Sequence, residues 1–331
     1  MKNYLNFWNI LYKNGNKIMI ILLDNREQHV LIRRMTPYFK ELGHSLTLDR
    51  TKCDVQLSQI KISKKSGKAI VLRLDGIYYN QADRYQQKNR TITVAHSRAD
   101  AIIYQSYFSK KMCEHYLRKR NTELWDVIYN GIEKNWCGKF IDHEEINIIA
   151  SAKWRRHKRL KETIEIFLIY LNKFPKAKLH ILGKLHDNHQ VKHPNIIYYG
   201  MVNYKKMAEI YRLGDMFIHL SKKDSCPNAV VEAIGAGIPV ITTSACGGST
   251  EMCKLTKGCI ICKGDSNTIK PCLPYSDAYN VLPPKLKNNL VNAMIEISNV
   301  KRRVILPDEL NIKTTAKKYI NILEKAIQRK K

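Results

Sequence analysis

The chain has 331 residues, a hydrophobic content of 44% and a formal net charge of +28. This length exceeds the usual size of a single core, so we expect two domains of roughly 150 residues each. The charge is compatible with nucleic acid, an anionic membrane surface or a phosphate-bearing substrate, and a general Lys/Asn/Ile bias accounts for it equally well. No RNA-recognition, zinc-finger or homeodomain signature accompanies the charge, so nucleic acid is the weaker interpretation.

Cysteine usage and apolar runs indicate the compartment. The chain has nine cysteines at irregular spacing, which favours reduced thiols in the cytoplasm over a disulfide framework. Only Cys259 and Cys262 have metal-like spacing, but their segment is predicted as a strand, in which they point to opposite faces, so we expect no metal site. Residues 1–17 lack the apolar region and cleavage site of a signal peptide. Since no apolar run reaches the length of a membrane span, we expect a soluble or peripherally membrane-associated cytoplasmic protein.

From residue 17 onward, short β-branched runs alternate with longer amphipathic runs, which is typical of parallel sheets with crossover helices. The first series predicts strands at 17–24, 45–49, 69–76, 101–106 and 126–131 and helices at 27–42, 81–97 and 107–120. The alternation restarts at residue 146 and predicts strands at 146–153, 178–184, 195–200, 216–221, 239–244 and 259–262, with helices near 158–173 and 203–213 and a third beginning at 227.

This restart predicts two doubly wound α/β units in tandem. The join lies near 130–146, where Asn130-Gly131 supplies a turn signal. The domains are expected at 1–140 and 141–312, followed by an amphipathic C-terminal helix at 313–331 that packs back towards the N-terminal domain. Residues 265–284 are rich in Pro and Asn and predict a long loop.

The segment 224–239, "DSCPNAVVEAIGAGIP", carries two carboxylates around a helix start. Pro227 fits the first helical turn, and the preceding strand places the helix N-terminus at the carboxyl edge of the sheet, where open α/β sheets bind ligands. First-turn amides favour a phosphate. Glu232 lies roughly 7–8 Å along this helix, so Asp224 and Glu232 could hold different hydroxyls of one extended ligand. A core helix capped by Asp224, with Glu232 solvated, explains the pattern equally well.

Two further segments follow strands of the same sheet. Gly247-Gly248 comes after the strand at 239–244 and lets backbone amides approach a ligand at a second helix start. Lys153 ends the strand at 146–153, and Lys158 is expected to begin the next helix, which places two cations at the same edge. The combination is more specific than any one of its parts.

These motifs resemble glycosyltransferase family 4, a family of retaining glycosyltransferases of the GT-B fold. That family carries a Glu-x(7)-Glu motif, an "EAxAxGxPV" run and a later "GGxxE". This chain has Asp224 and Glu232 at that spacing, "EAIGAGIPV" at 232–240 and "GGSTE" at 247–251. Asp224 replaces the first Glu, and Lys153 replaces the Arg of the family's Arg-x(4)-Lys pair, which keeps the charge but loses the bidentate fork. The resemblance extends through 127–133, which is similar to the family's interdomain segment, and more weakly through 71–76 and 99–110.

The resemblance implies an α/β GT-B fold, with two Rossmann-like doubly wound domains facing each other across a cleft, the first binding the acceptor and the second the donor. It implies retaining transfer of a sugar from a nucleoside diphosphate sugar to a hydroxyl of a glycan or other acceptor, without a metal or another cofactor. By the same resemblance, Glu232 would hold the ribose and Asp224 the transferred sugar. The diphosphate and sugar would face Lys153, Lys158 and the amides of Asn228, Ala229, Gly247 and Gly248.

The N-terminal half has fewer specific signals. The segment 22–29, "LLDNREQH", lacks the Gly-rich loop that family members often have after their first strand. Asp75 is the candidate for the place of the usual acceptor-side histidine, and a simple Asp-Gly turn explains it equally well. His96 is expected to be structural. The alternatives are a sugar-nucleotide epimerase of the same architecture and a non-catalytic protein that binds sugar nucleotides or nucleic acid.

Overall fold

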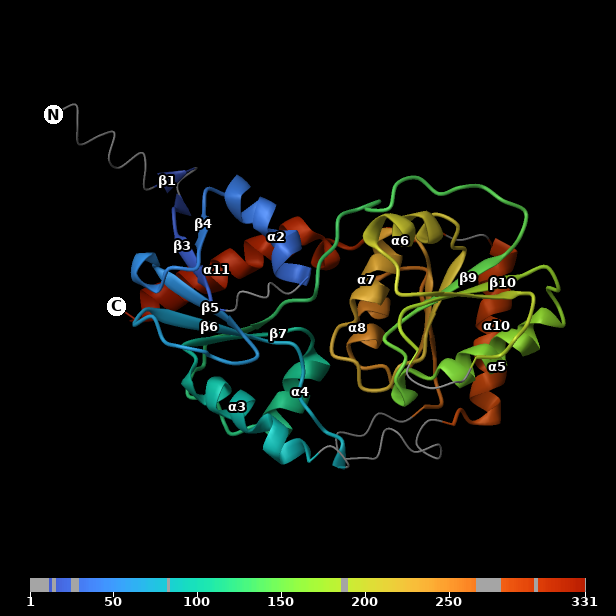
Figure 1. Ribbon diagram of the computed structural model, residues 1–331, viewed down its shortest axis with the longest axis horizontal. Helices are drawn as coiled ribbons and strands as arrows, with labels where there is room; N and C mark the ends of the chain where they lie inside the picture. Colours follow the sequence, from blue (N-terminus) through green and yellow to red (C-terminus); the bar gives the residue numbers. More distant parts are fainter. Residues whose placement is uncertain are drawn as a thin grey trace. The chain divides into compact units, whose positions relative to one another are not determined.

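The computed structural model describes residues 12–13, 16–24, 30–81, 84–185, 190–265, 281–300 and 303–330 (Figure 1). The chain divides into two compact units, each containing a six-stranded sheet. Unit 1 consists of Met1–Tyr78, Arg84–Gly131 and Ile312–Lys331, and unit 2 of Tyr79–Asp83 and Ile132–Asn311.

The sheet of unit 1 is parallel throughout and has the strand order β4-β3-β5-β6-β7-β8. The order reverses between β3 and β5, as in a doubly wound sheet. Every residue of β6 and β7 is buried, which is expected for parallel strands covered on both faces. The strands are β3 (Ile20–Leu23), β4 (Ser45–Thr47), β5 (Val55–Gln59), β6 (Ala69–Leu74), β7 (Ala101–Tyr104) and β8 (Trp125–Val127), preceded by the antiparallel pair β1 (Tyr12–Lys13) and β2 (Asn16–Lys17).

Strand β5 is not predicted from the sequence, because Gln56 and Ser58 interrupt its apolar pattern. Both side chains are buried, and their polar groups find partners. Gln56 Nε2 donates to Ser58 Oγ at 3.1 Å and to the Lys64 carbonyl at 2.9 Å, and Gln56 Oε1 accepts from the Ser66 amide at 2.9 Å. Hydrogen bonding to the loop that follows therefore offsets the cost of burying polar groups in a central strand.

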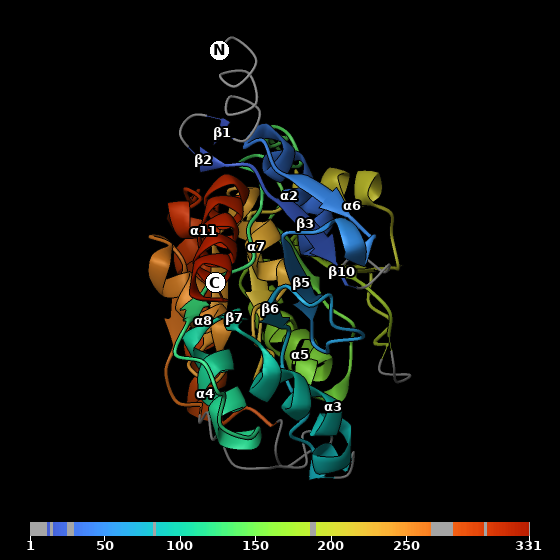
Figure 2. The ribbon, with the colours of Figure 1, turned by 90° about the vertical axis from the view of Figure 1, so that its left-hand side faces the viewer.

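The C-terminal helix α11 (Ile312–Lys330) belongs to unit 1. It packs against α2 (Val30–Glu41) and strands β5, β6 and β7, as Figures 1 and 2 show. The residues of α11 that are buried lie at helical spacing: Ile312, Thr315, Ala316, Tyr319, Ile320, Ile322, Leu323 and Ala326. The last segment of the chain thus completes the core that the first segment begins. The other helices in the described part of unit 1 are α3 (Tyr85–Arg98), α4 (Tyr107–Tyr116) and the 3₁₀ turn η1 (Arg50–Lys52).

The sheet of unit 2 is also parallel, with the strand order β11-β10-β9-β12-β13-β14. Its direction of winding reverses between β9 and β12, so the carboxyl ends of these two strands flank the position at which doubly wound sheets bind ligands. The strands are β9 (Asn147–Ser151), β10 (Lys178–Leu182), β11 (Ile196–Gly200), β12 (Met216–His219), β13 (Val240–Thr243) and β14 (Ile260–Cys262).

The helices of unit 2 include one that the sequence does not predict. Helix α10 (Pro284–Val300) packs against α5, β13 and β14. Of the loop predicted at 265–284, residues 266–280 lie outside the described part of the chain. The remaining helices are α5 (Leu160–Leu171), α6 (Tyr204–Tyr211), α7 (Asn228–Gly235) and α8 (Gly248–Leu255), with the 3₁₀ turns η3 (Arg156–Lys158) and η4 (Asp308–Leu310). Among the residues described, no helix has the length and apolar character needed to cross a membrane.

The docking of α11 gives a test of unit 1. Leu323 is fully buried, so we expect Leu323→Ala to lower the free energy of unfolding of unit 1 by about 2–5 kcal/mol, measured by hydrogen exchange in β5 and β6 under increasing urea. The control is Lys325→Ala at an exposed position of the same helix, which should stay within about 0.5 kcal/mol. Equal effects of the two substitutions would contradict this packing.

Candidate functional site

The candidate site lies where four neighbouring strands of unit 2 end. Strands β9, β12, β13 and β14 are adjacent and parallel, so the loops that follow them meet at one edge of the sheet. In chain order these loops carry Lys158, Asp224, Gly247 and Asp265. The first two loops flank the reversal of winding, which is the expected position for a ligand.

Lys158 and Asp224 are in direct contact at this edge. The Lys158 ammonium donates to Asp224 Oδ2, and His219 Nε2 lies 3.6 Å from the same oxygen. Burial acts to raise the pKa of Asp224, but Lys158 and His219 outweigh it and hold that pKa well below its usual range. Asp224 is therefore an ionised carboxylate that accepts hydrogen bonds and has no proton to donate.

The two histidines beside this pair are neutral at pH 7. Burial lowers the pKa of His219, although the Asp224 carboxylate acts in the opposite direction. Burial, with a smaller contribution from the Lys158 charge, lowers the pKa of His157 to about 3. The positive charge at this edge therefore comes from lysine and arginine side chains. Within the described residues, two buried hydroxyl oxygens here lack a hydrogen-bond partner, which is uncommon in folded proteins: Ser221 Oγ and Ser249 Oγ.

Backbone hydrogen bonds join the loop after β12 to the loop after β13. The Gly248 amide donates to the Asp224 carbonyl at 2.8 Å, and the Lys223 amide donates to the Ala245 carbonyl at 3.3 Å. Gly247 precedes α8 with φ of +62° and ψ of −120°, a conformation that glycine adopts without a steric penalty. Gly248 thus holds the Asp224 loop against the start of α8, whereas the sequence suggested only that its amide faces a ligand.

The remaining candidates, Lys153, Asn228, Ala229 and Glu232, belong to the loop after β9 and to the first turns of α7. Lys153 follows β9 and is exposed, and its ammonium makes no ion pair with any described residue. Asn228 and Ala229 begin α7, where first-turn amides precede the intrahelical bonds. Glu232 is the fifth residue of α7 and is 7% exposed, and its carbonyl accepts a 2.7 Å hydrogen bond from Trp136 Nε1.

Lys158 does not begin the helix, contrary to the sequence prediction. It ends the 3₁₀ turn η3, and α5 starts at Leu160 after Arg159, which has φ of +60°. This left-handed residue turns the chain by an extra step before the helix. As a result Lys158 faces Asp224, whereas the Arg159 side chain is fully buried.

Arg159 leads to a buried carboxylate that sequence inspection missed. Its guanidinium donates to Asp265 at 2.6 and 3.3 Å and to the Leu220 carbonyl at 3.3 Å. The Asp265 carboxylate also pairs with Lys222 Nζ at 3.4 Å and accepts from Thr243 Oγ1 at 3.0 Å. Asp265 follows β14 and therefore ties together the ends of all four strands. The only sequence signal was a charged Asp after a Gly at the end of the last strand.

The chemical state of Asp265 follows from these partners. Burial acts to raise its pKa, but the bonds from Arg159, Lys222 and Thr243 together hold it below its ordinary value. The two cations next to it belong to the loops that carry Lys158 and Asp224. An ionised Asp265 thus fixes the loop after β9 through Arg159 and the loop after β12 through Lys222.

In unit 1, Asp75 follows β6 at the carboxyl edge of that sheet. Its carboxylate pairs with Arg73 and accepts from Gln105 Nε2 at 2.9 Å. Arg73 is fully buried and also donates to Asn130 Oδ1 at 3.0 Å. Asp75 is therefore held by the side chains of Arg73 and Gln105, which come from two neighbouring strand ends, and this is more than a simple turn requires.

His96 and the cysteine pair have structural surroundings. His96 is buried on α3, with Nε2 2.8 Å from the Tyr104 hydroxyl and Nδ1 2.9 Å from the Arg118 carbonyl, so both ring nitrogens are used. Cys262 ends β14 and is buried, and Cys259 Sγ accepts from the Val240 amide at 3.3 Å. In the described ranges, no three His, Cys, Asp or Glu side chains come together as metal ligands.

Comparisons with known proteins bear on the fold and on the segment that carries this edge. Residues 136–270 match the family model described as glycosyl transferases group 1, a segment that contains the whole carboxyl edge of unit 2. No curated protein sequence matches the chain. Among solved structures, HepE of Anabaena in complex with UDP and glucose is similar with a TM-score of 0.60 at 14% identity, over 93% of this chain and 100% of HepE. The fold is GT-B.

Two further GT-B neighbours are glycosyltransferases. AviGT4, which is involved in avilamycin A biosynthesis, has a TM-score of 0.57 at 12% identity, over 94% of this chain and 98% of AviGT4. The pneumococcal O-GlcNAc transferase GtfA has a TM-score of 0.57 at 11% identity, over 96% of this chain but only 64% of GtfA. At these identities the likeness shows the fold, and it confirms the fold class predicted from the sequence.

The Asp265 cluster gives a prediction for unit 2. Asp265→Asn should lower the free energy of unfolding by about 3 kcal/mol, because it leaves Arg159 buried without a counter-charge. The pKa of Asp265 is lower in the folded than in the unfolded protein. Its contribution to the free energy of unfolding is therefore present above the unfolded pKa and is lost as the pH falls through the folded pKa. Hydrogen exchange of β9 and β12 in urea at several pH values measures both effects. Glu144→Gln, at an exposed site, is the matched control.

Proposed function

We propose that this protein is a retaining glycosyltransferase that moves a sugar from a nucleoside diphosphate sugar to an acceptor hydroxyl in glycan or glycoconjugate synthesis. The observation that carries the proposal is the contact between Lys158 and the ionised Asp224 at the reversal of winding in unit 2. The glycosyl transferases group 1 match covers this same edge, and the GT-B fold supports it.

The diphosphate of the donor requires positive charge where the glycosidic bond breaks. Lys153 is exposed and makes no ion pair with any described residue. Lys158 follows it in the same loop and is half-buried. The first-turn amides of Asn228 and Ala229 and the backbone at Gly247 add donors at two helix starts. These groups together would stabilise the leaving diphosphate without a metal ion.

The two acidic residues have different tasks in this proposal. An ionised Asp224 accepts hydrogen bonds from hydroxyls of the transferred sugar, and Glu232, one and a half turns into α7, holds the ribose. Donor binding would draw Lys158 from Asp224 to the phosphates, which frees the carboxylate oxygen for the sugar. After the exchange Lys158 is paired with a phosphate, and Asp224 accepts hydrogen bonds from sugar hydroxyls, so neither group is left without a partner.

The donor and acceptor can be narrowed by chemistry. HepE binds UDP and glucose, so UDP-sugars are the first donors to assay. The acceptor contact is proposed at the carboxyl edge of unit 1, where Asp75 is held by Arg73 and Gln105. Retention would follow from a front-side reaction in which the leaving phosphate takes the proton of the acceptor hydroxyl.

Substitutions in unit 2 test the donor site. Lys158→Gln and Glu232→Gln should each lower kcat/KM for UDP-sugar transfer on the order of 100-fold, because each removes a charged contact to the donor. Transfer is measured as UDP release in the presence of acceptor candidates, and donor affinity is measured by isothermal titration. Lys158→Arg keeps the charge and should recover most of the affinity.

Lys161→Gln is the matched control, since Lys161 is exposed on α5 and lies outside the site. It should transfer sugar at the rate of the unaltered protein. If Lys158→Gln and Glu232→Gln bound and used the donor as well as this control does, the proposed site would be wrong. UDP-sugar isomerisation without transfer would indicate an epimerase.

The stereochemistry of the product tests the mechanism. Transfer run with EDTA present should proceed at an unchanged rate and give a product with the anomeric configuration of the donor, as measured by the anomeric proton coupling in NMR. Lysine and backbone donors, rather than a metal, would then be stabilising the leaving group. An inverted product would exclude the front-side mechanism, and inhibition by EDTA would exclude metal independence.

A further inference from the structure

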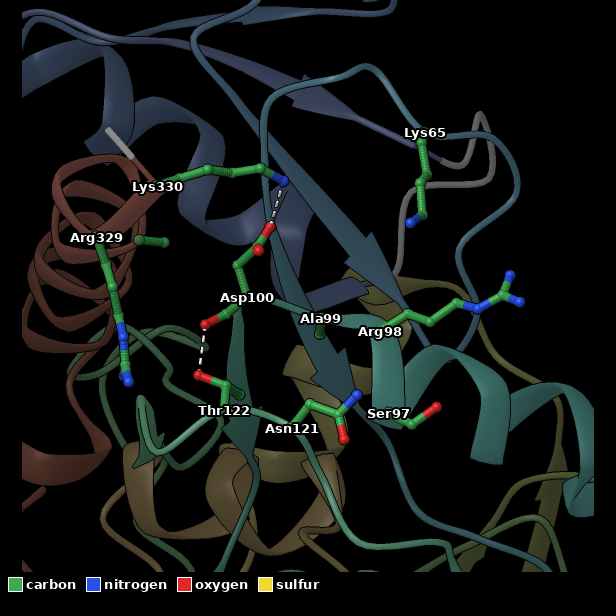
Figure 3. Close-up of a pocket in the computed structure, with 10 residues that line it drawn as sticks. Lys65, Ser97, Arg98, Ala99, Asp100, Asn121, Thr122, Arg329 and Lys330 are labelled. Atoms are coloured by element: carbon green, nitrogen blue, oxygen red, sulfur yellow. Dashed lines mark hydrogen bonds and ion pairs between the residues drawn. The ribbon is translucent and has the colours of Figure 1, made fainter.

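A basic hollow lies at the amino edge of the unit 1 sheet, the edge opposite to Asp75. Its volume is about 330 Å³, and it is lined by the segments just before β7 and β8 and by the end of α11. Figure 3 shows Lys330 reaching from α11 to Asp100, with Lys65 and Arg98 on one side and Arg329 on the other. Four cations and one carboxylate therefore surround the hollow.

The single carboxylate is already satisfied by the protein. Asp100 Oδ2 accepts from Lys330 Nζ and from the Ile70 amide, each at 2.8 Å, and the Asp100 carbonyl accepts from Thr122 Oγ1 at 2.7 Å. By contrast, the charged groups of Lys65, Arg98 and Arg329 make no ion pair or hydrogen bond with any part of the chain that is described, and all three are exposed. The hollow thus has an excess of unpaired positive charge.

A second hollow of about 430 Å³ adjoins the first and shares Lys65 and Arg98 with it. It adds three more cations, Lys61, Lys64 and Arg90. Its lining contains no carboxylate. The helix dipole favours cations at the C-terminus of a helix, which accounts for the positions of Arg98 and Arg329 in the last turns of α3 and α11. It does not explain Lys61, Lys64 and Lys65, which lie in the loop before β6, outside any helix.

We propose that these two adjoining hollows form a binding site for a phosphate-bearing anion, with Lys65, Arg98 and Arg329 as its charged contacts. Arginine and lysine side chains pair strongly with phosphate oxygens, and the two connected hollows suit a ligand with more than one phosphate. The phosphate could belong to a soluble compound or to a lipid headgroup. The site does not depend on the proposed transfer reaction, since its residues all belong to unit 1 and the donor candidates all belong to unit 2.

The test compares two variants of equal net charge. The site variant is Lys65→Gln/Arg98→Gln/Arg329→Gln, and the control replaces three exposed lysines of unit 1 that line neither hollow: Lys40→Gln/Lys111→Gln/Lys325→Gln. The probe is inorganic pyrophosphate, and its binding is located by hydrogen exchange of 97–102, 119–124 and 322–330. Pyrophosphate should slow exchange in these segments, including in a Lys158→Gln background.

We expect the site variant to weaken the affinity that these segments report by about tenfold or more, and the control by less than twofold. Equal weakening in both variants would show that only the overall charge matters and would overturn the proposal, as would a lack of protection in the unaltered protein. If Lys158→Gln abolished protection by pyrophosphate only at the carboxyl edge of unit 2, while the segments of unit 1 stayed protected, the result would support a separate site in unit 1.

Vesicles distinguish the two sources of phosphate. Phosphatidylglycerol/phosphatidylcholine vesicles are compared with pure phosphatidylcholine in sedimentation. Binding of the anionic vesicles that is lost in the site variant and kept in the control supports a lipid headgroup. Protection by pyrophosphate without variant-sensitive vesicle binding supports a soluble phosphate compound.

Discussion

The buried ion pair between Arg159 and Asp265 is the contact on which the candidate site depends. Asp265 follows the last strand of unit 2 and contacts groups that follow or end the other three strands of the same edge. A buried carboxylate with several donors is stable only when all of them are in place, so the four loops are fixed together. This fixed edge holds Lys158 against Asp224 and keeps both charges next to the reversal of winding.

The charges of the two units are arranged differently. At the carboxyl edge of unit 2, Lys158 pairs with Asp224, Arg159 and Lys222 pair with Asp265, and His157 and His219 are neutral because burial lowers their pKa. At the amino edge of unit 1, exposed cations outnumber the one carboxylate, which is already paired. Part of the excess positive charge of the chain is thus unpaired at this hollow.

Hydrophobic pattern and motif spacing were sufficient to predict most strands and helices and the sheet edge on which the candidate residues lie. Alternating apolar runs predicted five strands of the unit 1 sheet and all six strands of the unit 2 sheet closely enough to place Asp224, Lys158 and Gly247 after neighbouring strands. Strand β5 was missed because its polar side chains are satisfied by the loop that follows it, and α10 because no cap or motif marks it. The start of α5 was misplaced because a left-handed conformation at Arg159 carries no sequence signal.

By itself, the sequence determined the α/β class, the two doubly wound series and the family resemblance of residues 146–252, because periodicity and motif spacing are local properties of the chain. Only the tertiary structure decided that the Gly248 amide is hydrogen-bonded to the Asp224 carbonyl and that Asp265 joins the four loops. Each of these contacts links residues far apart in the chain or on different strands. Their formation depends on sheet order and burial, which spacing along the sequence does not encode.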